Sequence, residues 1–214
     1  MPLQRSRLPR FDGGIYCGRI RRHSARLAPH DVHNARVAIT SGTDDPTALA
    51  VAAFVIIAVS KDQETALNTI ERALSLNASC AVALYFGALV YAFSGDSSAA
   101  VAHADRALRL SPFDPLSYLA HEAYGMAAVG QSRLDEAASH FGRAAQGNTG
   151  LGIIDLYHAA VLALAGRVEE ARPIARRGLE LMPGWRVRMF LEIGMAAAVA
   201  DKFREGARLL RLPE

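Results

Sequence analysis

The spacing of small residues constrains the fold of this chain more than any other feature of its sequence. Ala73, Ala107, Ala144 and Gly178 follow one another at intervals of 34, 37 and 34 residues. Seven residues before each of them stands an alanine, and an apolar residue lies four positions after that alanine: Ala66, Ala100, Ala137 and Ala171, then Ile70, Ala104, Phe141 and Ala175. Because positions i, i+4 and i+7 share one helix face, each copy predicts a helix with a small–apolar–small stripe for close packing.

A second helical stretch lies upstream of each stripe. Turn-forming residues separate the two stretches at 94–97 ("SGDS"), at 130–132 and at 165–167 ("AGR"). Each unit therefore predicts a helix, a short turn and a second helix, and stacked units of this length form a solenoid. A composition that is 51% hydrophobic but only 7% aromatic also favours close helix-on-helix packing.

These units predict an all-α solenoid of about four antiparallel helix pairs with a C-terminal capping helix. The interval of 37 residues implies about three extra residues, which we expect in the turns around 112–115 or 130–134. Pro173 falls inside the second helix of the last unit, so we expect that helix to begin late or to bend there. The expected organisation is an Arg-rich, disordered leader at 1–30 and one helical domain at 31–214, with repeats at about 47–80, 81–114, 118–151 and 152–185 and C-terminal helices at 186–212.

The period and the small residues at fixed places resemble tetratricopeptide (TPR) repeats. The second unit carries the pattern most fully, and the first unit departs from it, with Phe54 at a usually small position and Ala78 in place of proline. The residues of the second unit that fit the pattern are Leu84, Ala88, Tyr91, Ala100, Ala104, Ala107 and Pro112. The resemblance covers roughly residues 47–183 and implies a non-catalytic module for protein–protein interaction.

A narrower resemblance concerns residues 105–144, which begin "DRALRLSPFDP", and the end of the chain, "LRLPE" at 210–214. Both are similar to the repeat tails that follow class III adenylate cyclase domains in proteobacteria, and some related tails follow winged-helix DNA-binding domains. The resemblance implies the regulatory tail of a bacterial signalling protein. Residues 1–46 are too few for a cyclase domain, so we expect no cyclase activity from this chain.

Charge and cysteine content limit the remaining classes of function and location. Residues 1–26 hold seven arginines against Asp12 alone, which keeps nucleic-acid binding through the leader open as an alternative, although the rest of the chain is acidic. The most apolar run, 48–59, is too short to cross a bilayer. Cys17 and Cys80 form no metal or disulfide pattern, so we expect a soluble, cytoplasmic protein without membrane contact.

Candidate chemical sites are few. "GGIYCG" at 13–18 lacks the Lys–Ser/Thr of a phosphate loop, and "HDVH" at 30–33 is interpreted as a solvated loop or frayed helix start rather than a metal site. His103 and His140 occupy matching repeat positions, where a stacked pair would bind metal or respond to pH, but a surface position is the preferred interpretation. Cys80 begins a helix and is interpreted as a small, buried apolar residue. We expect no catalytic residue, cofactor or metal.

By resemblance, the first helix of each pair lines a concave groove. The residues expected to face it are mostly apolar: Val82, Tyr85, Leu89, Phe93, Leu119, Glu122, Met126, Ile153, Leu156 and Leu164. The chain's only lysines, Lys61 and Lys202, are not among them, which disfavours a clamp for a peptide carboxylate. An apolar groove suits an amphipathic helix from a protein partner, from a second copy, or from residues 184–212 folding back. The alternative is that these residues complete the internal core.

Overall fold

The computed structural model describes residues 29–41 and 44–214, and all regular structure within these ranges is helical. The leader predicted at 1–30 lies almost entirely outside the described residues, as does "GGIYCG". The helices are α2 (Pro29–Thr40), α3 (Pro46–Val55), the π-helix η1 (Ile56–Ser60), α4 (Gln63–Leu76), α5 (Ala81–Ser94), α6 (Ser97–Leu110), α7 (Ser117–Gly130), α8 (Leu134–Gly147), α9 (Gly152–Leu164), α10 (Val168–Leu181), α11 (Met189–Glu192) and α12 (Ala197–Leu209).

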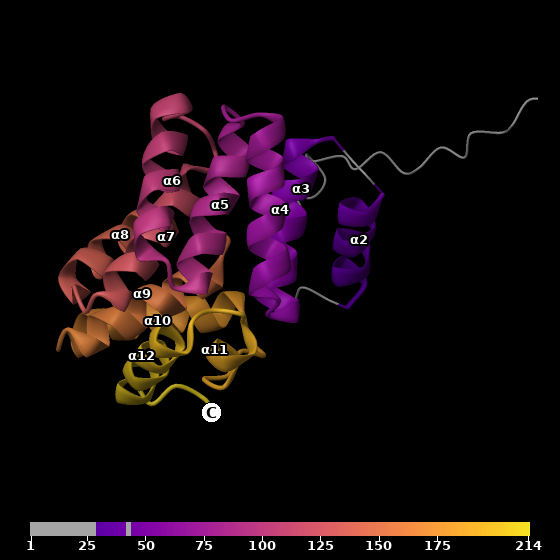
Figure 1. The fold of residues 1–214 in the computed structure, drawn as a ribbon. Coiled ribbons are helices and arrows are strands. Elements are labelled where there is room, and N and C mark those ends of the chain that lie inside the picture. The colour runs from indigo at the N-terminus through magenta and orange to yellow at the C-terminus, as the bar shows by residue number, and fades with distance from the viewer. Residues whose placement is uncertain (1–28, 42–43) are drawn as a thin grey trace, which may run out of the picture.

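Eight of these helices form four antiparallel pairs, α3 with α4, α5 with α6, α7 with α8 and α9 with α10, stacked in chain order (Figure 1). One pair lies in each predicted repeat. The all-α solenoid of four helix pairs is thus confirmed. α2 packs on α3 at one end of the array, and after α10 the chain turns back so that α12 packs on α9 and α7.

The recurring small residues are buried where helices cross. The alanines of the two stripe positions are fully buried in all four repeats: Ala66, Ala73, Ala100, Ala107, Ala137, Ala144 and Ala171, with Gly178 at the last. In the third repeat the apolar place between them holds Phe141 instead of a smaller residue. Gly125 of α7 makes room for it, because a Cβ at this position would lie 2.8 Å from the Phe141 ring. The size of one residue is therefore matched to its neighbour across the helix pair.

Local signals set the helix ends. Asp45, Asp62 and Asp96 each accept a hydrogen bond from a backbone N–H in the first turn of the helix that follows, which stabilises the start of α3, α4 and α6. The long interval is explained by the connections at 111–116 and 131–133, which exceed those of the preceding repeat by two residues and one. Both turns named from the sequence therefore share the insertion.

Pro173 does not delay its helix. α10 begins at Val168 and continues through Pro173 to Leu181, so the predicted late start is wrong. The proline removes one backbone hydrogen bond, and because its position is exposed, water can satisfy the carbonyl that is left free.

The register of the stripes gives a stability prediction. Ala137→Leu adds three carbon atoms at a fully buried contact, so it is expected to lower the free energy of unfolding by about 1–3 kcal/mol. The matched control is Ala102→Leu on the exposed face of α6, which should change stability by less than about 0.5 kcal/mol. Urea denaturation of both variants measures the difference, and equal stabilities would contradict the register.

Candidate functional site

The predicted groove residues lie on the first helices of the second, third and fourth pairs. Seven of them are buried: Tyr85, Leu89, Phe93, Leu119, Glu122, Met126 and Leu156. Val82, Ile153 and Leu164 are half-buried. Leu156 lies against Gly178 of α10, and the Tyr85 hydroxyl donates to Ser111 O, so these two side chains pack within the array. We call the side formed by the first helices α5, α7 and α9 the inner face, and it is covered along α7 and α9 by another part of the same chain.

The cover is the C-terminal segment, residues 185–214, which we call the strap. Its aromatic side chains meet those of the array in one cluster. The Phe203 ring of α12 lies 4.6 Å from the ring of Tyr157 and 5.8 Å from that of Phe141, measured between ring centroids. Phe190 of α11 stacks on Tyr157, and Trp185 meets Phe190 edge to face. The strap thus buries its largest side chains against α8 and α9.

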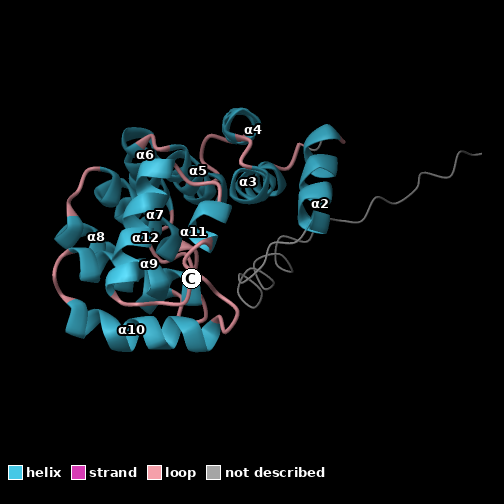
Figure 2. Cartoon of the chain, turned by 90° about the horizontal axis from the view of Figure 1, so that it is seen from below, coloured by secondary structure: helices cyan, strands magenta, loops and turns pink. Residues whose placement is uncertain are grey.

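α12 lies between α7 and α9 (Figure 2). α3 packs on α5 and α5 packs on α7, whereas α7 and α9 scarcely touch each other and both contact α12. The close approach to α9 requires Gly206, because a Cβ there would lie 2.0 Å from the carbonyl oxygen of Ala160. α12 therefore occupies the place where the inner helices of the third and fourth repeats would otherwise meet.

The strap also donates hydrogen bonds to the open C-terminal ends of three inner helices. The N–H of Gly194 donates to Ala58 O of η1 (3.1 Å), and the N–H of Ala196 donates to Phe93 O of α5 (2.7 Å). The Lys202 ammonium donates to Val129 O of α7 at 2.7 Å. The last carbonyls of a helix have no partner inside it. These contacts supply one to Ala58 O and Phe93 O, and they add a second donor at Val129 O, which also accepts from the N–H of Ser132.

The π-helix η1 forms one of these attachment points. It is followed by Lys61 in the left-handed conformation, with φ of 57°. The Lys61 ammonium donates to Leu191 O of the strap, and a Cβ on Gly194 would lie 1.7 Å from Ile57 O. Widened turns of this type often occur at functional positions in helices, and here the turn carries the contact with the strap.

Glu122 is the charged residue of the predicted groove. Its side chain on α7 is 6% exposed and makes no hydrogen bond or ion pair with any described residue. Burial raises the pKa of this carboxyl group to about 8. Its charge acts on the hydroxyl of Tyr157, whose ring contacts Phe190 and Phe203 of the strap. Glu122 thus lies in the same interior as the aromatic cluster.

His103 and His140 are half-buried, and they do not form the stacked pair considered as the alternative to a surface position. His140 of α8 stacks on His121 of α7, with ring centroids 5.6 Å apart and the two Nδ1 atoms 3.4 Å apart. His103 instead lies against Tyr91, at 4.7 Å between centroids. Tyr124 contacts both rings of the pair and donates a short hydrogen bond to Asp105. Only one proton fits between the two Nδ1 atoms, so double protonation is disfavoured.

This pair predicts a loss of stability in acid. Burial lowers the pKa of both His121 and His140, and the charge of the other ring lowers that of His121 further. The unfolded chain therefore binds more protons, so stability is complete above the ordinary pKa of 6.5 and falls as the pH drops towards the folded values. His121→Phe is expected to make the melting temperature fall less between pH 6.5 and 5. The exposed His33 gives the control, because His33→Phe should leave the slope unchanged.

The other candidate positions that the structure describes do not form a cluster of metal-binding side chains. The described part of the chain contains no group of three or more His, Cys, Asp or Glu side chains able to hold a metal ion. "HDVH" falls in the first turns of α2, where His33 is exposed, in agreement with a helix start. Cys80 is half-buried at the N-cap of α5, with its Sγ 3.8 Å from the Thr47 hydroxyl. None of the described helices is long and apolar enough to span a membrane.

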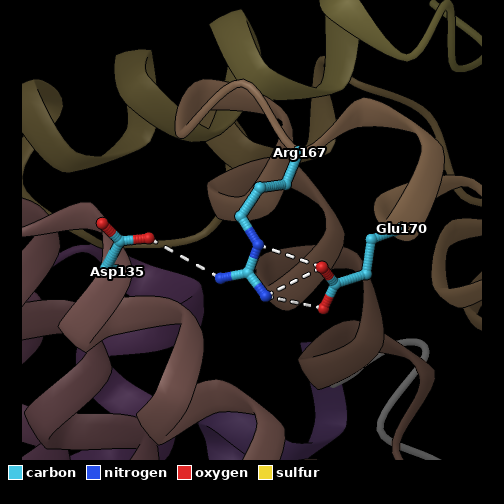
Figure 3. Close-up of polar contacts among 3 residues, drawn as sticks. All are labelled: Asp135, Arg167 and Glu170. Atoms are coloured by element: carbon cyan, nitrogen blue, oxygen red, sulfur yellow. Dashed lines mark hydrogen bonds and ion pairs between the residues drawn. The ribbon is translucent and has the colours of Figure 1, made fainter.

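Ion pairs link the last two repeats on their outer surface. Arg167 at the start of α10 pairs with Glu170 at 2.8 Å and reaches Asp135 of α8 at 3.6 Å (Figure 3). Glu169 and Arg172 also form the pair expected from their spacing, at 3.2 Å. All these side chains are exposed, and such pairs contribute about 0–1 kcal/mol, so they mark a solvated face rather than a site.

Comparison with known proteins identifies the fold. The sequence matches no protein-family model and no curated protein. Among solved structures it is similar to PilW, a widely conserved type IV pilus biogenesis factor, with a TM-score of 0.59 and 18% identity over 93% of this chain and 87% of PilW.

A MamA RS-1 double mutant matches with a TM-score of 0.51 and 15% identity over 79% of this chain and 92% of that one. MamA AMB-1 matches with a TM-score of 0.51 and 18% identity over 73% and 97%. At these identities the likeness concerns the fold alone, and it agrees with the pairing of helices described above. The chain is folded as a TPR-like α-solenoid whose C-terminal strap packs on the inner helices α7 and α9.

Proposed function

We propose that this chain is a protein-interaction scaffold that binds an amphipathic helix of a protein partner on its inner face. The observation that carries the proposal is α12 itself, an amphipathic helix seated between α7 and α9. The face that receives it includes Tyr157 and Ala160 of α9, both buried, which lie against Phe203 and Gly206 of α12. A surface that already binds one helix has the shape and the chemistry to bind another.

Site-directed crosslinking tests this proposal. A photoreactive benzoylphenylalanine at the half-buried Ile153 of α9 is expected to crosslink to one defined helix of a partner protein in cells. The same residue at the exposed Arg176 of α10, on the outer surface, is the control and should give no such product. Mass spectrometry maps the crosslinked peptide. Equal crosslinking from both positions would contradict binding at the inner face.

The sequence resemblance of residues 105–144 and 210–214 supports a more specific setting. On this resemblance we propose that the scaffold is the non-catalytic, cytoplasmic regulatory module of a bacterial signalling protein of the adenylate cyclase type. Purified protein is then expected to form no cyclic AMP from ATP and Mg²⁺, in parallel with an active class III cyclase as the positive control. Cyclic AMP formation that scales with the amount of this chain would overturn the non-catalytic assignment.

The arginines of residues 1–26 support nucleic-acid binding as the second candidate function. Binding through them would weaken steeply with salt, because each neutralised phosphate releases a counterion. A fluorescent 20-base-pair DNA titrated at 50 and 200 mM salt measures this. Binding that disappears when residues 1–28 are deleted would favour this function, and affinity that is independent of salt would exclude it.

A further inference from the structure

We propose that the strap, residues 185–214, is an autoinhibitory occupant of the inner face, and that the partner helix replaces it by presenting the same Lys–Phe–x–x–Gly pattern. This inference rests on the proposed function of the inner face. It adds a regulatory step to that function, since the array must release its own segment before it binds another. It also specifies the partner's chemistry.

The strap is held by contacts that another chain can reproduce. Its hydrogen bonds go from Gly194, Ala196 and Lys202 to carbonyl oxygens at the ends of η1, α5 and α7. These acceptors belong to the array and remain in place when the strap leaves. Any incoming segment with free N–H groups or a lysine can satisfy them, so the exchange conserves hydrogen bonds.

The fit of the strap is incomplete. Among the described residues, three buried side-chain atoms lack a hydrogen-bond partner, and two of them, Trp185 Nε1 and Arg204 Nε, belong to the strap. The Glu122 carboxyl group of α7 makes no hydrogen bond with a described residue either, but its oxygens are not among the fully buried atoms. Buried polar groups are normally paired, so the closed state leaves two polar atoms of the strap without a partner. A partner helix that leaves no polar atom unpaired would have an advantage over the strap.

The spacing of the inner helices requires a helix at this place. α3 and α5 pack directly, as do α5 and α7, but α7 and α9 are bridged by α12 (Figure 2). Loss of α12 without replacement would expose the apolar sides of α7 and α9. Exchange for a partner helix leaves them covered, so the open and closed states differ in the identity of the helix and not in the area buried.

Three residues of α12 define what the face accepts. Lys202 caps α7, Phe203 fills the aromatic cluster, and Gly206 allows the approach to Ala160 of α9. They stand at positions i, i+1 and i+4, so they project from adjoining parts of the helix surface. A partner helix is therefore expected to carry a lysine, an aromatic residue and a small residue at this spacing.

A labelled peptide of residues 195–212 provides the probe, added to the full-length chain and followed by fluorescence anisotropy. The loosened variant is Gly206→Ala, whose added Cβ meets a backbone carbonyl that cannot move aside. It is expected to bind the peptide at least about 10-fold more tightly than the unmodified chain, because a covalently attached strap competes at millimolar effective concentration. The matched control, Arg208→Ala on the exposed side of α12, should bind like the unmodified chain.

Two further readouts test the pattern and the motion. A peptide carrying Phe203→Ala should lose binding to the loosened chain. Trp185 is the only tryptophan and is buried in the strap, so its fluorescence emission should shift to longer wavelength as the peptide displaces the strap. Binding without this shift would place the peptide elsewhere and overturn the exchange.

Other results would overturn autoinhibition. If Gly206→Ala keeps its helical circular dichroism but binds the peptide no more tightly than the unmodified chain, the strap is a permanent part of the core. Should that variant fail to fold, Lys202→Met takes its place, because it removes the hydrogen bonds of the Lys202 ammonium at the end of α7. If Lys202→Met binds the peptide no more tightly than the unmodified chain, the strap is again a permanent part of the core. A dimer of the loosened variant in light scattering would assign the face to a second copy instead of a partner protein.

Two outcomes distinguish a failure of autoinhibition from a failure of partner binding. If the peptide displaces the strap in vitro but no partner is crosslinked at Ile153 in cells, autoinhibition by the strap is supported and the scaffold function is contradicted. A partner crosslinked equally well to the unmodified and Gly206→Ala chains would keep the scaffold function and remove autoinhibition.

Discussion

Glu122→Gln is expected to stabilise the protein at pH 8 by up to about 4 kcal/mol and to leave its stability at pH 4.5 nearly unchanged. The carboxyl group titrates at about 8 in the folded chain and at 4.5 in its ordinary environment. The unfolded chain therefore loses this proton first, so stability decreases as the pH rises from 4.5 to 8, at about 1.4 kcal/mol per pH unit. Glutamine has the same shape and cannot ionise, which removes this slope.

Urea denaturation at pH 5 and pH 8 measures the effect of Glu122→Gln. The control is Glu136→Gln, on the exposed surface of α8, for which the difference between the two pH values should match that of the unmodified chain. A variant that is no more stable than the unmodified chain at pH 8 would show that Glu122 acquires a partner in solution. In that case Glu122 would not lack a hydrogen-bond partner.

Phe203→Ala is expected to cost about 3–5 kcal/mol of the free energy of unfolding. Phe203 is fully buried and its ring contacts those of Phe141, Tyr157 and Phe190. Removing it leaves a cavity where α8, α9 and the strap meet, and α10 separates the strap from both helices in the sequence. Because each repeat is stabilised by its neighbours, the fourth helix pair should lose most protection.

Thermal unfolding and hydrogen exchange measure the consequence of Phe203→Ala. Leu209→Ala on the same helix is the control, because Leu209 is half exposed and should cost less than about 1 kcal/mol. Faster exchange is expected in α9 and α10, with α4 to α6 little changed. Uniform loss of protection along the whole array would instead show that the four pairs unfold as one unit.

The helix pairs could be predicted from the sequence because their signals are local or strictly periodic. A stripe such as Ala137, Phe141 and Ala144 is defined within eight residues, and its recurrence fixes how one pair stacks on the next. Asp62 and Asp96 cap their helices through hydrogen bonds to residues three positions away. The same periodicity placed Tyr85, Leu119 and Leu156 on inner helices. It left open whether that face is an empty groove, an occupied one or part of the core.

The contacts of the strap could not be predicted from the sequence. A glycine within an amphipathic helix, such as Gly206, signals close approach of another backbone but does not say which one. The contact between His121 and His140 was likewise not predicted, because repeat positions align His103 with His140 whereas packing of neighbouring helices joins His140 to His121.

The sequence alone determined an all-α array of four helix pairs and gave a prediction, still to be tested, of the residues that face its inner side. Only the tertiary structure decided that this face is covered, by which segment, and that Glu122 is buried without a partner. The physical reason is separation along the chain. Lys61 and Leu191 meet across 130 positions and Lys202 and Val129 across 73, and no periodic pattern records contacts between segments that occur only once.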